Sequence, residues 1–386
     1  MKVLALTEGP DSVCCRYRIS AFAWALAERG LYLDVASLRK DPVGRVRQLV
    51  AARRADVVIL QRKLLPTWQL LLLRRSARRL IYDVDDAVFQ RDSYSRKPPE
   101  SWSRTARFWA TVYAADAVVT GNDYLGRFAT GLVGPERVRR IPTCVEPNWY
   151  LPAWHYRTGP AARLVWIGQS STLASLDRVR PQLAAAARRL PGLQLRLICD
   201  RSIELGPLDV VPRRWSSGAE ADELADGDVG INWLPDDSWS RGKCGLRVLQ
   251  YMAAGLPVVA NPVGANREMV IHGHTGLLAS TPREWSDAIA RLAADPQLRR
   301  KLGAAGRRMV QHQYSVAAWG PRFAELVASV VRGNKEIDSR GSLREPTFCP
   351  RKGCESFGNN LYDGHPSPSI QSISDFPTGS EAHRTH

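Results

Sequence analysis

The stretch 241-RGKCGLRVLQYMAAGLPVVANPVGANREMV-270 places a glycine-bounded helix directly before a short apolar strand. The pattern predicts a helix that begins near Leu246 and a buried strand at PVVA. Gly242 and Gly245 would let the backbone approach a bulky group closely. Because a helix start offers unpaired N–H groups and the positive end of the helix dipole, we predict an anion-binding site there.

Two polar side chains on this segment indicate what kind of anion would bind. Lys243 adds a full positive charge at the helix start, which suits a diphosphate better than a single carboxylate. Gln250 lies four residues after Leu246 on the same helix face, and its amide can both donate to and accept from a pair of sugar hydroxyls. The alternative is an ordinary helix–strand unit with a surface lysine. We favour the binding site because glycines, cation and amide coincide at one helix start.

Short apolar runs alternate with helical segments along most of the chain. Six such runs before residue 145 predict a parallel sheet covered on both faces: KVLAL, LYLDVASL, ADVVILQ, RLIYDVD, DAVVTG and VRRIPT. One continuous helix is predicted over YRISAFAWALAERG, ending at Gly30. A second series of strands, ARLVWIG, LQLRLICD, VGINWLP and LPVVANP, precedes three amphipathic helices, the last of which starts at Ser315.

The predicted fold class is α/β, with two Rossmann-like doubly wound parallel-sheet domains facing a central cleft. A length of 386 residues is enough for two such cores. Ligands of these folds bind at the carboxyl ends of the strands, so the cleft is the expected site. The predicted boundaries are an N-terminal domain over 1–150, a linker over 151–162, a C-terminal domain over 163–332 and a disordered tail over 333–386.

The formal net charge of +16 at pH 7 implies anionic partners. The arginines are spread over several predicted helices without a nucleic-acid-binding motif, so no nucleic-acid partner is expected. No apolar run reaches the roughly 18–20 residues of a membrane span, and the apolar start is too short for a secretory signal. Seven scattered cysteines do not form a disulfide framework. A cytoplasmic protein with reduced thiols is expected.

The segment VWIGQSSTLASL is a second candidate for anion binding. A predicted strand ends at Gly168, and a helix can start after Ser170, Ser171 or Thr172. Their hydroxyl and N–H groups could hold phosphate oxygens. A plain Ser/Thr helix cap explains this stretch equally well.

The acidic run in IYDVDDAVF follows a predicted strand and places Asp83, Asp85 and Asp86 at its carboxyl end. Three interpretations compete: an Mg²⁺-binding D-x-D pair of a different transferase fold, the nucleophile motif of a haloacid-dehalogenase phosphatase, or a capping aspartate beside one that faces the cleft and contacts an acceptor. We favour the third, because the first needs another fold and the second places this motif at the start of the domain. Asp85 and Asp86 are therefore candidate catalytic residues.

Three other segments have both a functional and a plain interpretation. Arg16 and Arg18 lie in the first strand-to-helix loop. They either bind a phosphate or an acidic acceptor, or they are solvated charges of the helix. Arg16 is the better candidate for binding. LPTWQLLLLRRSARR, around Trp68, is either a helix that rests on an anionic membrane or a core helix with arginines in water. In the tail, CPRKGC has two cysteines without a second C-x-x-C, which is weak evidence for zinc.

With these motifs in order, the sequence resembles the family-4 retaining glycosyltransferases of the GT-B fold over about residues 1–332. The matching segments are RYRI, LQRKLLP, IYDVDDAVF, GNDYL, IPTCVEPNWY, VWIGQSST, DDSWSRGKCG and the segment from GKCG to QYMAAGLPVVA. Family members usually carry two glutamates eight residues apart before AAGLPVVA. This chain departs from that pattern, with Gly242 and Gln250 at those positions, and resembles a branch with GKCG and QYMA.

The resemblance implies a retaining sugar transfer from a nucleotide-diphosphate sugar bound to the C-terminal domain in the cleft, with the acceptor on the N-terminal side. It implies that Gln250 keeps the ribose contact that the second glutamate makes in the family. Relatives use a lysine after the Gly168 turn, with an arginine, on the diphosphate; Lys243 would substitute for it here. Gly245 and Leu246 would complete the donor site, and no metal or other cofactor is expected.

The sequence thus predicts a hexosyltransferase-type enzyme that moves a sugar from a UDP- or GDP-sugar to a hydroxyl of a saccharide, a lipid-linked saccharide or a small molecule, as in polysaccharide biosynthesis. It would be cytoplasmic, with or without peripheral contact at the inner face of an anionic membrane. The alternatives are a non-catalytic nucleotide-sugar binder and a nucleotide-sugar epimerase or a phosphatase using Asp83 and Asp85.

Overall fold

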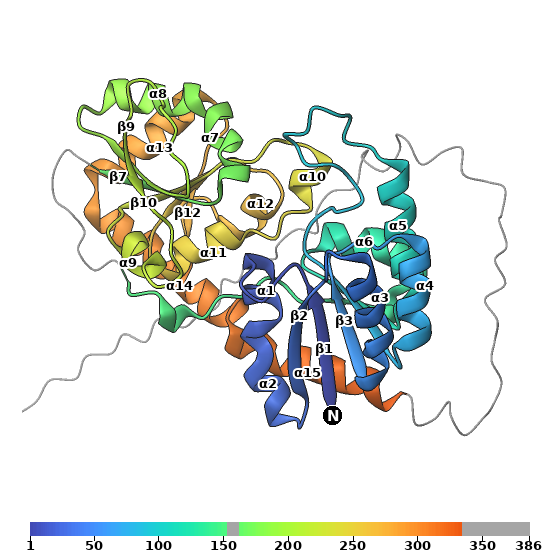
Figure 1. Ribbon diagram of the computed structural model, residues 1–386. Coiled ribbons are helices and arrows are strands. Elements are labelled where there is room, and N and C mark those ends of the chain that lie inside the picture. Colours follow the sequence, from blue (N-terminus) through green and yellow to red (C-terminus); the bar gives the residue numbers. More distant parts are fainter. Residues whose placement is uncertain (153–161, 334–386) are drawn as a thin grey trace, which may run out of the picture. The chain divides into compact units, whose positions relative to one another are not determined.

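The computed structural model describes residues 1–152 and 162–333 and contains two parallel six-stranded sheets (Figure 1). The first sheet has the strand order β2-β1-β3-β4-β5-β6. Its strands are β1 (Lys2–Thr7), β2 (Tyr32–Ser37), β3 (Val57–Gln61), β4 (Leu80–Val84), β5 (Ala117–Thr120) and β6 (Val138–Arg140). All six correspond to the apolar runs in the sequence, so this half of the predicted fold is confirmed.

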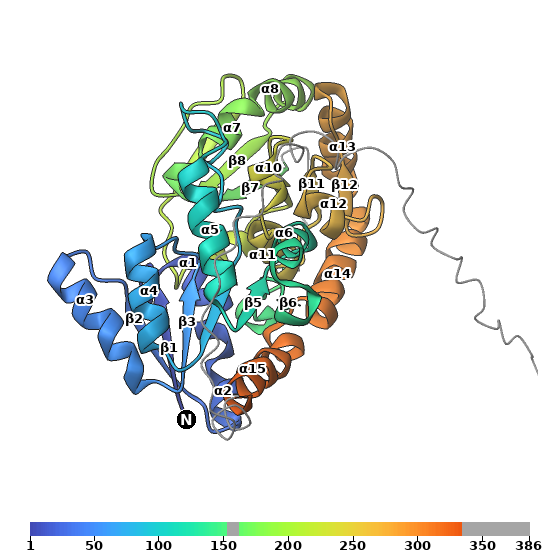
Figure 2. The same cartoon turned by 90° about the vertical axis from the view of Figure 1, so that its right-hand side faces the viewer.

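Helices cover both faces of the first sheet. They are α1 (Val13–Arg18), α2 (Ala23–Glu28), α3 (Pro42–Ala51), α4 (Thr67–Ser76), α5 (Trp102–Ala114) and α6 (Asp123–Val133), with short 3₁₀ turns at η1 (Ser20–Phe22), η2 (Ala52–Arg54), η3 (Pro135–Arg137) and η4 (Pro147–Trp149). The predicted continuous helix before Gly30 is therefore divided into α1, η1 and α2. Figure 2 shows α3 and α4 on one side of the strands and α2 on the other.

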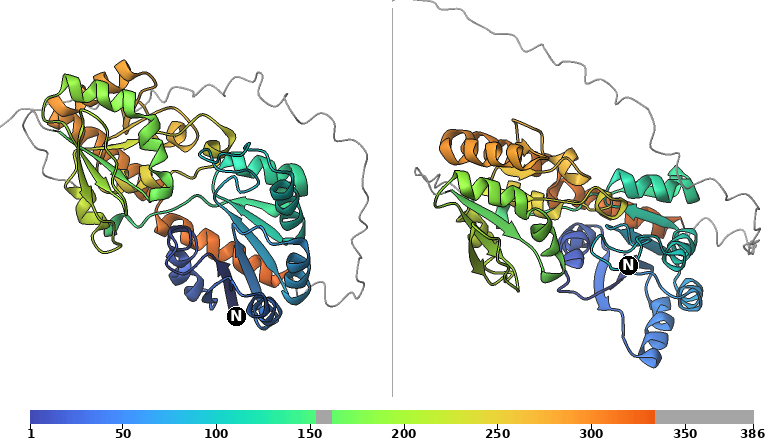
Figure 3. Two further views of the ribbon diagram at one scale, coloured as in Figure 1. Left: turned by 45° about the horizontal axis from the view of Figure 1, so that its top comes forward. Right: turned by 90° about the horizontal axis from the view of Figure 1, so that it is seen from above.

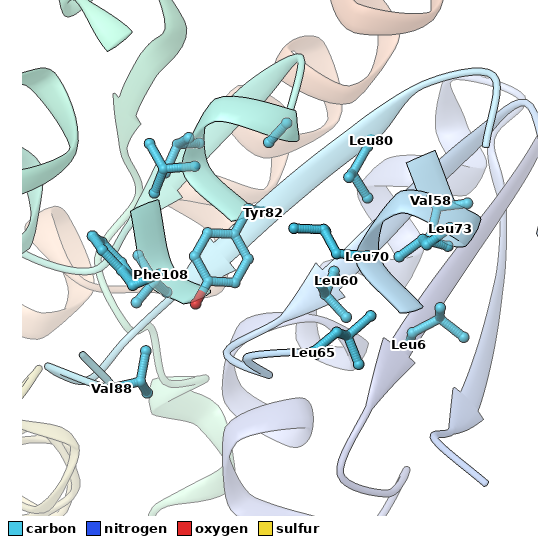
Figure 4. Packing of buried hydrophobic residues seen from close by; sticks show 14 of the residues in the cluster. Leu6, Val58, Leu60, Leu65, Leu70, Leu73, Leu80, Tyr82, Val88 and Phe108 are labelled. Carbon is cyan, nitrogen blue, oxygen red and sulfur yellow. The ribbon is translucent and has the colours of Figure 1, made fainter. Parts of the chain in front are cut away.

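The residues of β3 show how the sheet separates two cores. Val58 and Leu60 pack with buried leucines of α4, whereas Val57 and Ile59 pack on the opposite face. This alternation follows from the two-residue period of a strand. Figure 4 shows Leu70 of α4 in the first of these cores, beside Leu60 and Leu80. Leu70 and Leu73 of α4 are thus core, as the plain interpretation predicted, whereas Leu71 is exposed.

The second sheet has the order β12-β11-β10-β7-β8-β9. Its strands are β7 (Arg163–Ile167), β8 (Gln194–Ile198), β9 (Asp209–Arg213), β10 (Val229–Asn232), β11 (Val258–Ala260) and β12 (Gly276–Leu278). Its helices are α7 (Ala174–Arg178), α8 (Arg180–Arg189), α9 (Glu220–Ala225), α10 (Ser238–Arg241), α11 (Leu246–Ala253), α12 (Ala265–Met269), α13 (Pro282–Ala294) and α14 (Pro296–Gln313), with a 3₁₀ turn η5 (Ser170–Thr172).

The sequence analysis did not predict either edge strand of the second sheet. β9 contains Pro212, which a strand tolerates only at an edge or bulge and which made the run unlike a strand. β12 has three residues, too few to show a period. The predicted helix start at Leu246 and the following strand are confirmed as α11 and β11.

The last helix, α15 (Val316–Arg332), packs on the first sheet although it follows the second in sequence. Its Phe323 ring lies 4.9 Å, centroid to centroid, from the ring of Phe22. Figure 3 shows this orange-red helix beside the blue N-terminal strands. Assigning all of 163–332 to the C-terminal domain was therefore wrong for α15, because an amphipathic pattern does not say which sheet its apolar face covers. The predicted linker (except 151, 152 and 162) and the tail from 334 lie outside the described residues.

Close packing of α14 on the α11–β11 connection predicts a large difference between two glycine substitutions. A Cβ on Gly303 would lie 1.8 Å from the carbonyl oxygen of Gly255, whereas a Cβ on Gly131 of α6 meets nothing within 4 Å. Gly303→Ala should lower the free energy of unfolding in urea by about 1–3 kcal/mol. Gly131→Ala should raise it by up to about 1 kcal/mol because alanine favours helix. Equal effects of the two substitutions would contradict the packing.

Candidate active site

A cleft of about 500 Å³ lies where carboxyl ends of strands from both sheets meet. Arg62 follows β3, Asp85 follows β4, Gly168 follows β7 and Leu234 lies just beyond β10, and all four line the cleft. The position of the cleft at the strand ends is the one predicted for two doubly wound sheets.

A buried ion pair forms the floor on the N-terminal side. Both Nε and Nη2 of Arg18, on α1, donate to the carboxylate of Asp83 at 2.5–3.1 Å, and Nη1 donates to the carbonyl oxygen of Ile141 at 3.0 Å. The side chains of Arg18 and Asp83 are each 1% exposed. Asp83 is therefore inaccessible as a nucleophile, which removes the structural basis of the phosphatase alternative.

Arg62 holds the other two aspartates and was not singled out in the sequence. Its guanidinium donates to Asp86 Oδ2 and to the sulfur of Cys14, and its Nε lies 3.5 Å from Asp85 Oδ1. Its backbone has a positive φ of 45°, rare for a residue with a side chain. The sequence signal was the cation directly after the β3 strand, within LQRKLLP.

Asp85 lines the cleft, and one of its carboxylate oxygens has no hydrogen-bond partner among the described residues. Its Oδ1 is buried and accepts no hydrogen bond within 1–152 and 162–333, so the ion pair with Arg62 is its only charged contact within 4 Å there. Burial favours the neutral carboxyl, but the charges of Arg62 and Arg18 outweigh it and hold the pKa of Asp85 below its ordinary value. Asp85 is thus an ionised carboxylate that Cys14 also stabilises, and its Oδ1 can accept a further hydrogen bond.

Lys243 lies at the mouth of α11, as predicted, but its charge already has a partner. Its Nζ lies 3.1 Å from Asp86 Oδ1 and 4.8 Å from the centroid of the Trp239 ring. The neighbouring glycines serve the protein's own packing: a Cβ on Gly242 would lie 2.7 Å from the Cβ of Ala87, and Gly245 has a φ of 67° that suits glycine. The close approach predicted from these glycines is therefore to the chain itself.

The Gly168 turn is a short 3₁₀ segment and not the start of a long helix. Gly168, Ser171 and Thr172 line the cleft, whereas Ser170 does not. The backbone N–H of Ser170 donates to Asp200 at 2.7 Å, so this N–H is not available to a ligand. Three of the four predicted residues of this turn therefore reach the cleft.

Arg247, the second residue of α11, is the main site residue that the sequence analysis missed. It donates to the carbonyl oxygen of Ile167, to Asn232 Oδ1 at 2.7 Å and to Thr172 Oγ1 at 3.3 Å. Its guanidinium carbon lies 4.3 Å from the centroid of the Trp166 ring. A Cβ on Gly168 would lie 2.8 Å from Arg247 Nη2, so the glycine makes room for the cation.

Arg247 differs from the cations of the opposite wall in having no carboxylate partner within 1–152 and 162–333. Burial lowers the pKa of its guanidinium below the ordinary value, because the charge is taken out of water without a compensating negative charge. An arginine still remains protonated. A partly buried cation beside a glycine turn, without a carboxylate partner among the described residues, is the strongest anion-binding feature of the cleft. The sequence signal was the arginine directly after the predicted helix start.

Gln250 lies at the other end of the same helix face within a buried polar cluster. Its amide donates to the hydroxyls of Tyr17 at 3.3 Å and Tyr150 at 3.5 Å. Both hydroxyls donate to Glu220 Oε1, at 2.6 and 2.8 Å, and Trp215 Nε1 donates to Glu220 Oε2 at 3.0 Å. Burial and the carboxylate raise the pKa of Tyr17 well above its ordinary value, which keeps the phenol protonated as a donor. Sequence analysis had not singled out this carboxylate.

Arg16 belongs to the rim of this cluster and not to the cleft lining. Its Nη1 lies 3.8 Å from Glu220 Oε2, and its guanidinium stacks against the rings of Tyr17 and Trp149. The preference for Arg16 over Arg18 is therefore not supported: Arg18 lines the cleft, and both cations already have a carboxylate partner.

Comparison with known sequences adds a family match at the same part of the chain. Residues 238–309, which include α11, match the model described as glycosyl transferases group 1. D-inositol 3-phosphate glycosyltransferase of Thermobispora bispora is 30% identical over 223 residues, 50% of either chain. A GDP-mannose-dependent alpha-(1-6)-phosphatidylinositol monomannoside mannosyltransferase of Mycobacterium tuberculosis is 26% identical over 284 residues, 69% of this chain and 67% of that one. The chain spans about half the length of the first of these relatives.

Solved structures match nearly the whole described chain. Sucrose-phosphate synthase from Thermosynechococcus elongatus has a TM-score of 0.68 at 18% identity, covering 86% of this chain and 99% of that one. Anabaena HepE in complex with UDP and glucose has a TM-score of 0.63 at 16% identity, covering 85% and 100%. The fold is therefore GT-B. Within it, residues 238–309 match the model described as glycosyl transferases group 1.

The buried Arg18–Asp83 pair predicts a strong energetic coupling between these residues. Arg18→Met leaves the Asp83 carboxylate buried and unpaired, which should lower the free energy of unfolding by about 3–5 kcal/mol. The double variant Arg18→Met, Asp83→Asn should recover part of that loss. Urea denaturation followed by circular dichroism measures both. Arg180→Met, which removes an exposed ion pair with Asp177, is the control and should leave the unfolding midpoint nearly unchanged. Additive effects of the two cleft substitutions would contradict the coupling.

Proposed function

We propose that this protein is a glycosyltransferase that moves a sugar from a nucleotide-diphosphate sugar to a hydroxyl acceptor. The observation that carries the proposal is Arg247, a partly buried cation in the cleft without a carboxylate partner among the described residues. A diphosphate supplies the missing negative charge. The GT-B fold and the group 1 signature at 238–309 support the same reaction class.

The diphosphate would bind between the Gly168 turn and the start of α11. Arg247 Nη2 lies beside Thr172 Oγ1 on one side of this position, and Lys243 lies at the helix mouth on the other. Backbone N–H groups at the start of α11 add the positive end of the helix dipole. Lys243 contributes less than Arg247, because Asp86 already neutralises it in part.

The nucleoside would bind next to the diphosphate, at the cluster around Gln250. Arg247 and Gln250 are three residues apart on α11, which places them about 4.5 Å apart along the helix axis and on the same side. That spacing suits a phosphate and the adjoining ribose. Gln250 and Glu220 offer a neutral amide and a carboxylate to the ribose hydroxyls, and the partly buried Trp215 offers an aromatic face to the base.

The chemistry needs stabilisation of the leaving diphosphate as the glycosidic bond breaks and positive charge develops on the sugar. Arg247, held by Trp166, Asn232 and Thr172, is preorganised to stabilise that negative charge. Asp85 is positioned on the opposite wall to accept a hydrogen bond from the acceptor hydroxyl. Transfer with retention on one face of the sugar requires no strong enzyme base, and we propose that outcome.

The nucleotide is proposed to be UDP or GDP. HepE has been solved with UDP and glucose, and the mannosyltransferase relative is GDP-mannose-dependent. The described residues contain no group of three or more His, Cys, Asp or Glu side chains placed to hold a metal ion. Independence from metal stays a prediction, as does a cytoplasmic location.

The outer helices of the first sheet suit an anionic membrane surface. Helices α3, α4 and α5 neighbour one another and contain six arginines and no acidic residue. Trp68 and Leu71 of α4 are 55% and 51% exposed, and Trp102 of α5 is 79% exposed. Apolar side chains among arginines favour peripheral contact with anionic lipid. No helix in the described ranges combines the length and apolarity needed to cross a bilayer.

Arg247→Ala should weaken binding of UDP or GDP by about 1.5–3 kcal/mol, because a charge-assisted contact is lost. Lys243→Ala should weaken it by less, and the exposed Lys301→Ala is the charge-matched control that should leave it unchanged. Isothermal titration of the full chain measures the affinities, after a thermal-shift screen with UDP, GDP and ADP selects the nucleotide. Binding of the free nucleoside should be much less affected by Arg247→Ala. Equal losses for nucleoside and diphosphate would show that Arg247 does not bind phosphate.

The competing functions give different products from the selected nucleotide sugar. A transferase releases the nucleoside diphosphate, slowly by hydrolysis or faster with an acceptor. An epimerase returns an intact nucleotide sugar, and a non-catalytic binder binds the donor without any turnover across a broad acceptor panel. Chromatography of the reaction mixture distinguishes these outcomes, and either of the last two would refute the proposal.

The membrane contact predicts co-flotation with anionic vesicles. The full chain should float with vesicles containing phosphatidylglycerol and not with pure phosphatidylcholine. Trp68→Ser with Leu71→Ser should reduce that binding about tenfold or more, because two exposed apolar side chains are removed. Ile271→Ser, an exposed apolar residue of the second lobe, is the control and should float like the unmodified protein. Unchanged flotation of the double variant would contradict this surface.

A further inference from the structure

We propose that the part of the acceptor that enters the cleft is a neutral polyol, held through a hydroxyl that donates to Asp85, and that phosphorylated acceptors are disfavoured at this position. The inference rests on the proposed glycosyl transfer and specifies its acceptor class. Its basis is the distribution of used and unused hydrogen-bonding groups on the N-terminal wall of the cleft.

One hydrogen-bond acceptor of this wall, Asp85 Oδ1, has no donor among the described residues. The side chain is 9% exposed, and its Oδ1 accepts no hydrogen bond in the described part of the chain. The 3.5 Å ion pair with Arg62 Nε and a contact with the Cys14 thiol keep the carboxylate ionised, and Oδ1 is left without a hydrogen bond. An ionised carboxylate accepts hydrogen bonds and donates none, so its matching ligand is a hydrogen-bond donor. Hydroxyls of a sugar or another polyol are such donors.

The cations of the same wall are already neutralised. Arg18 is bound to Asp83 through two of its nitrogens, and Arg62 contacts both Asp85 and Asp86. These two arginines are the cations that the N-terminal part contributes to the described cleft lining. A phosphate on the acceptor would therefore find no cation without a carboxylate on this wall.

The negative charge of this wall strengthens the preference for a neutral acceptor over a phosphorylated one. Asp85, Asp86 and Asp92 line the cleft against Arg18 and Arg62, with Lys243 of the other sheet paired to Asp86, and the partner of Arg18 is a further carboxylate. A second phosphate would meet like charge there at short range in a partly desolvated site. The opposite wall, by contrast, offers Arg247 to the donor diphosphate. The charge of the Arg247 wall thus suits the donor diphosphate, and the charge of the Asp85 wall suits a neutral acceptor.

The test compares neutral and phosphorylated members of the same polyol pair. Mannose with mannose 6-phosphate, and myo-inositol with myo-inositol 1-phosphate, are titrated into the full chain saturated with UDP or GDP, with calorimetry or saturation-transfer NMR as the readout. The neutral member should bind at least about tenfold more tightly than the phosphorylated one. The phosphorylated member would lose one charge-assisted hydrogen bond and would be repelled by the carboxylates. Equal or tighter binding of the phosphorylated members would overturn the proposal, and so would failure of both neutral polyols to bind.

Asp85→Asn is the decisive variant, because asparagine keeps the shape of the side chain and removes its charge. It should weaken binding of the neutral polyol about tenfold, and it should reduce the ratio of the affinities for the neutral and the phosphorylated polyol. A purely structural role of Asp85 would lower both affinities alike and leave their ratio unchanged, which would overturn the proposal. Asp34→Asn on β2, which carries an exposed ion pair with Lys2, is the matched control and should change neither affinity.

Nucleotide binding separates this inference from the proposed function. Asp85→Asn should retain the UDP or GDP affinity of the unmodified chain, because the donor contacts lie on the opposite wall. If the unmodified chain binds no nucleoside diphosphate, the glycosyltransferase proposal itself fails. If it binds the nucleotide and prefers phosphorylated polyols, the acceptor inference alone fails.

Discussion

The cleft is organised by an electrostatic asymmetry between its two walls. Arg247 is partly buried and has no carboxylate partner among the described residues, whereas Arg18 and Arg62 on the opposite wall are each bound to aspartates. Removing a charge from water without a partner is costly even when burial is partial, and charged groups perturbed in this way cluster at functional sites. The interpretation of the cleft as a site for a nucleotide-diphosphate sugar depends on this one uncompensated cation.

The rest of the site holds that cation and sets what lies around it. Gly168 has no side chain where a Cβ would meet the guanidinium, and Trp166 stacks against it. Side chains from the two halves of the fold also contact each other: Tyr17 of α1 donates to Glu220 of α9, and Lys243 pairs with Asp86. Groups from both sheets therefore meet at the proposed donor and acceptor positions, which is the arrangement that transfer between two bound substrates requires.

Sequence reasoning recovered what depends on local pattern. The six strands of the first sheet, the start of α11 at Leu246 and the cleft at the strand ends followed from periodicity and topology. The partner of each charge did not, because Arg18 and Asp83 are 65 residues apart and either could have faced a ligand. The glycine pattern at the helix start drew attention to Lys243, since a cation beside glycines is visible in sequence. Arg247 was passed over because nothing local shows that an arginine lacks a carboxylate partner in three dimensions.

The central claim is tested most directly by a crystal structure of the full chain with a non-hydrolysable UDP- or GDP-sugar. The account predicts pyrophosphate oxygens within about 3 Å of the Arg247 guanidinium nitrogens, next to the Gly168 turn, with the ribose toward Gln250. A diphosphate bound elsewhere in the cleft, with Arg247 making no contact to it, would contradict the account.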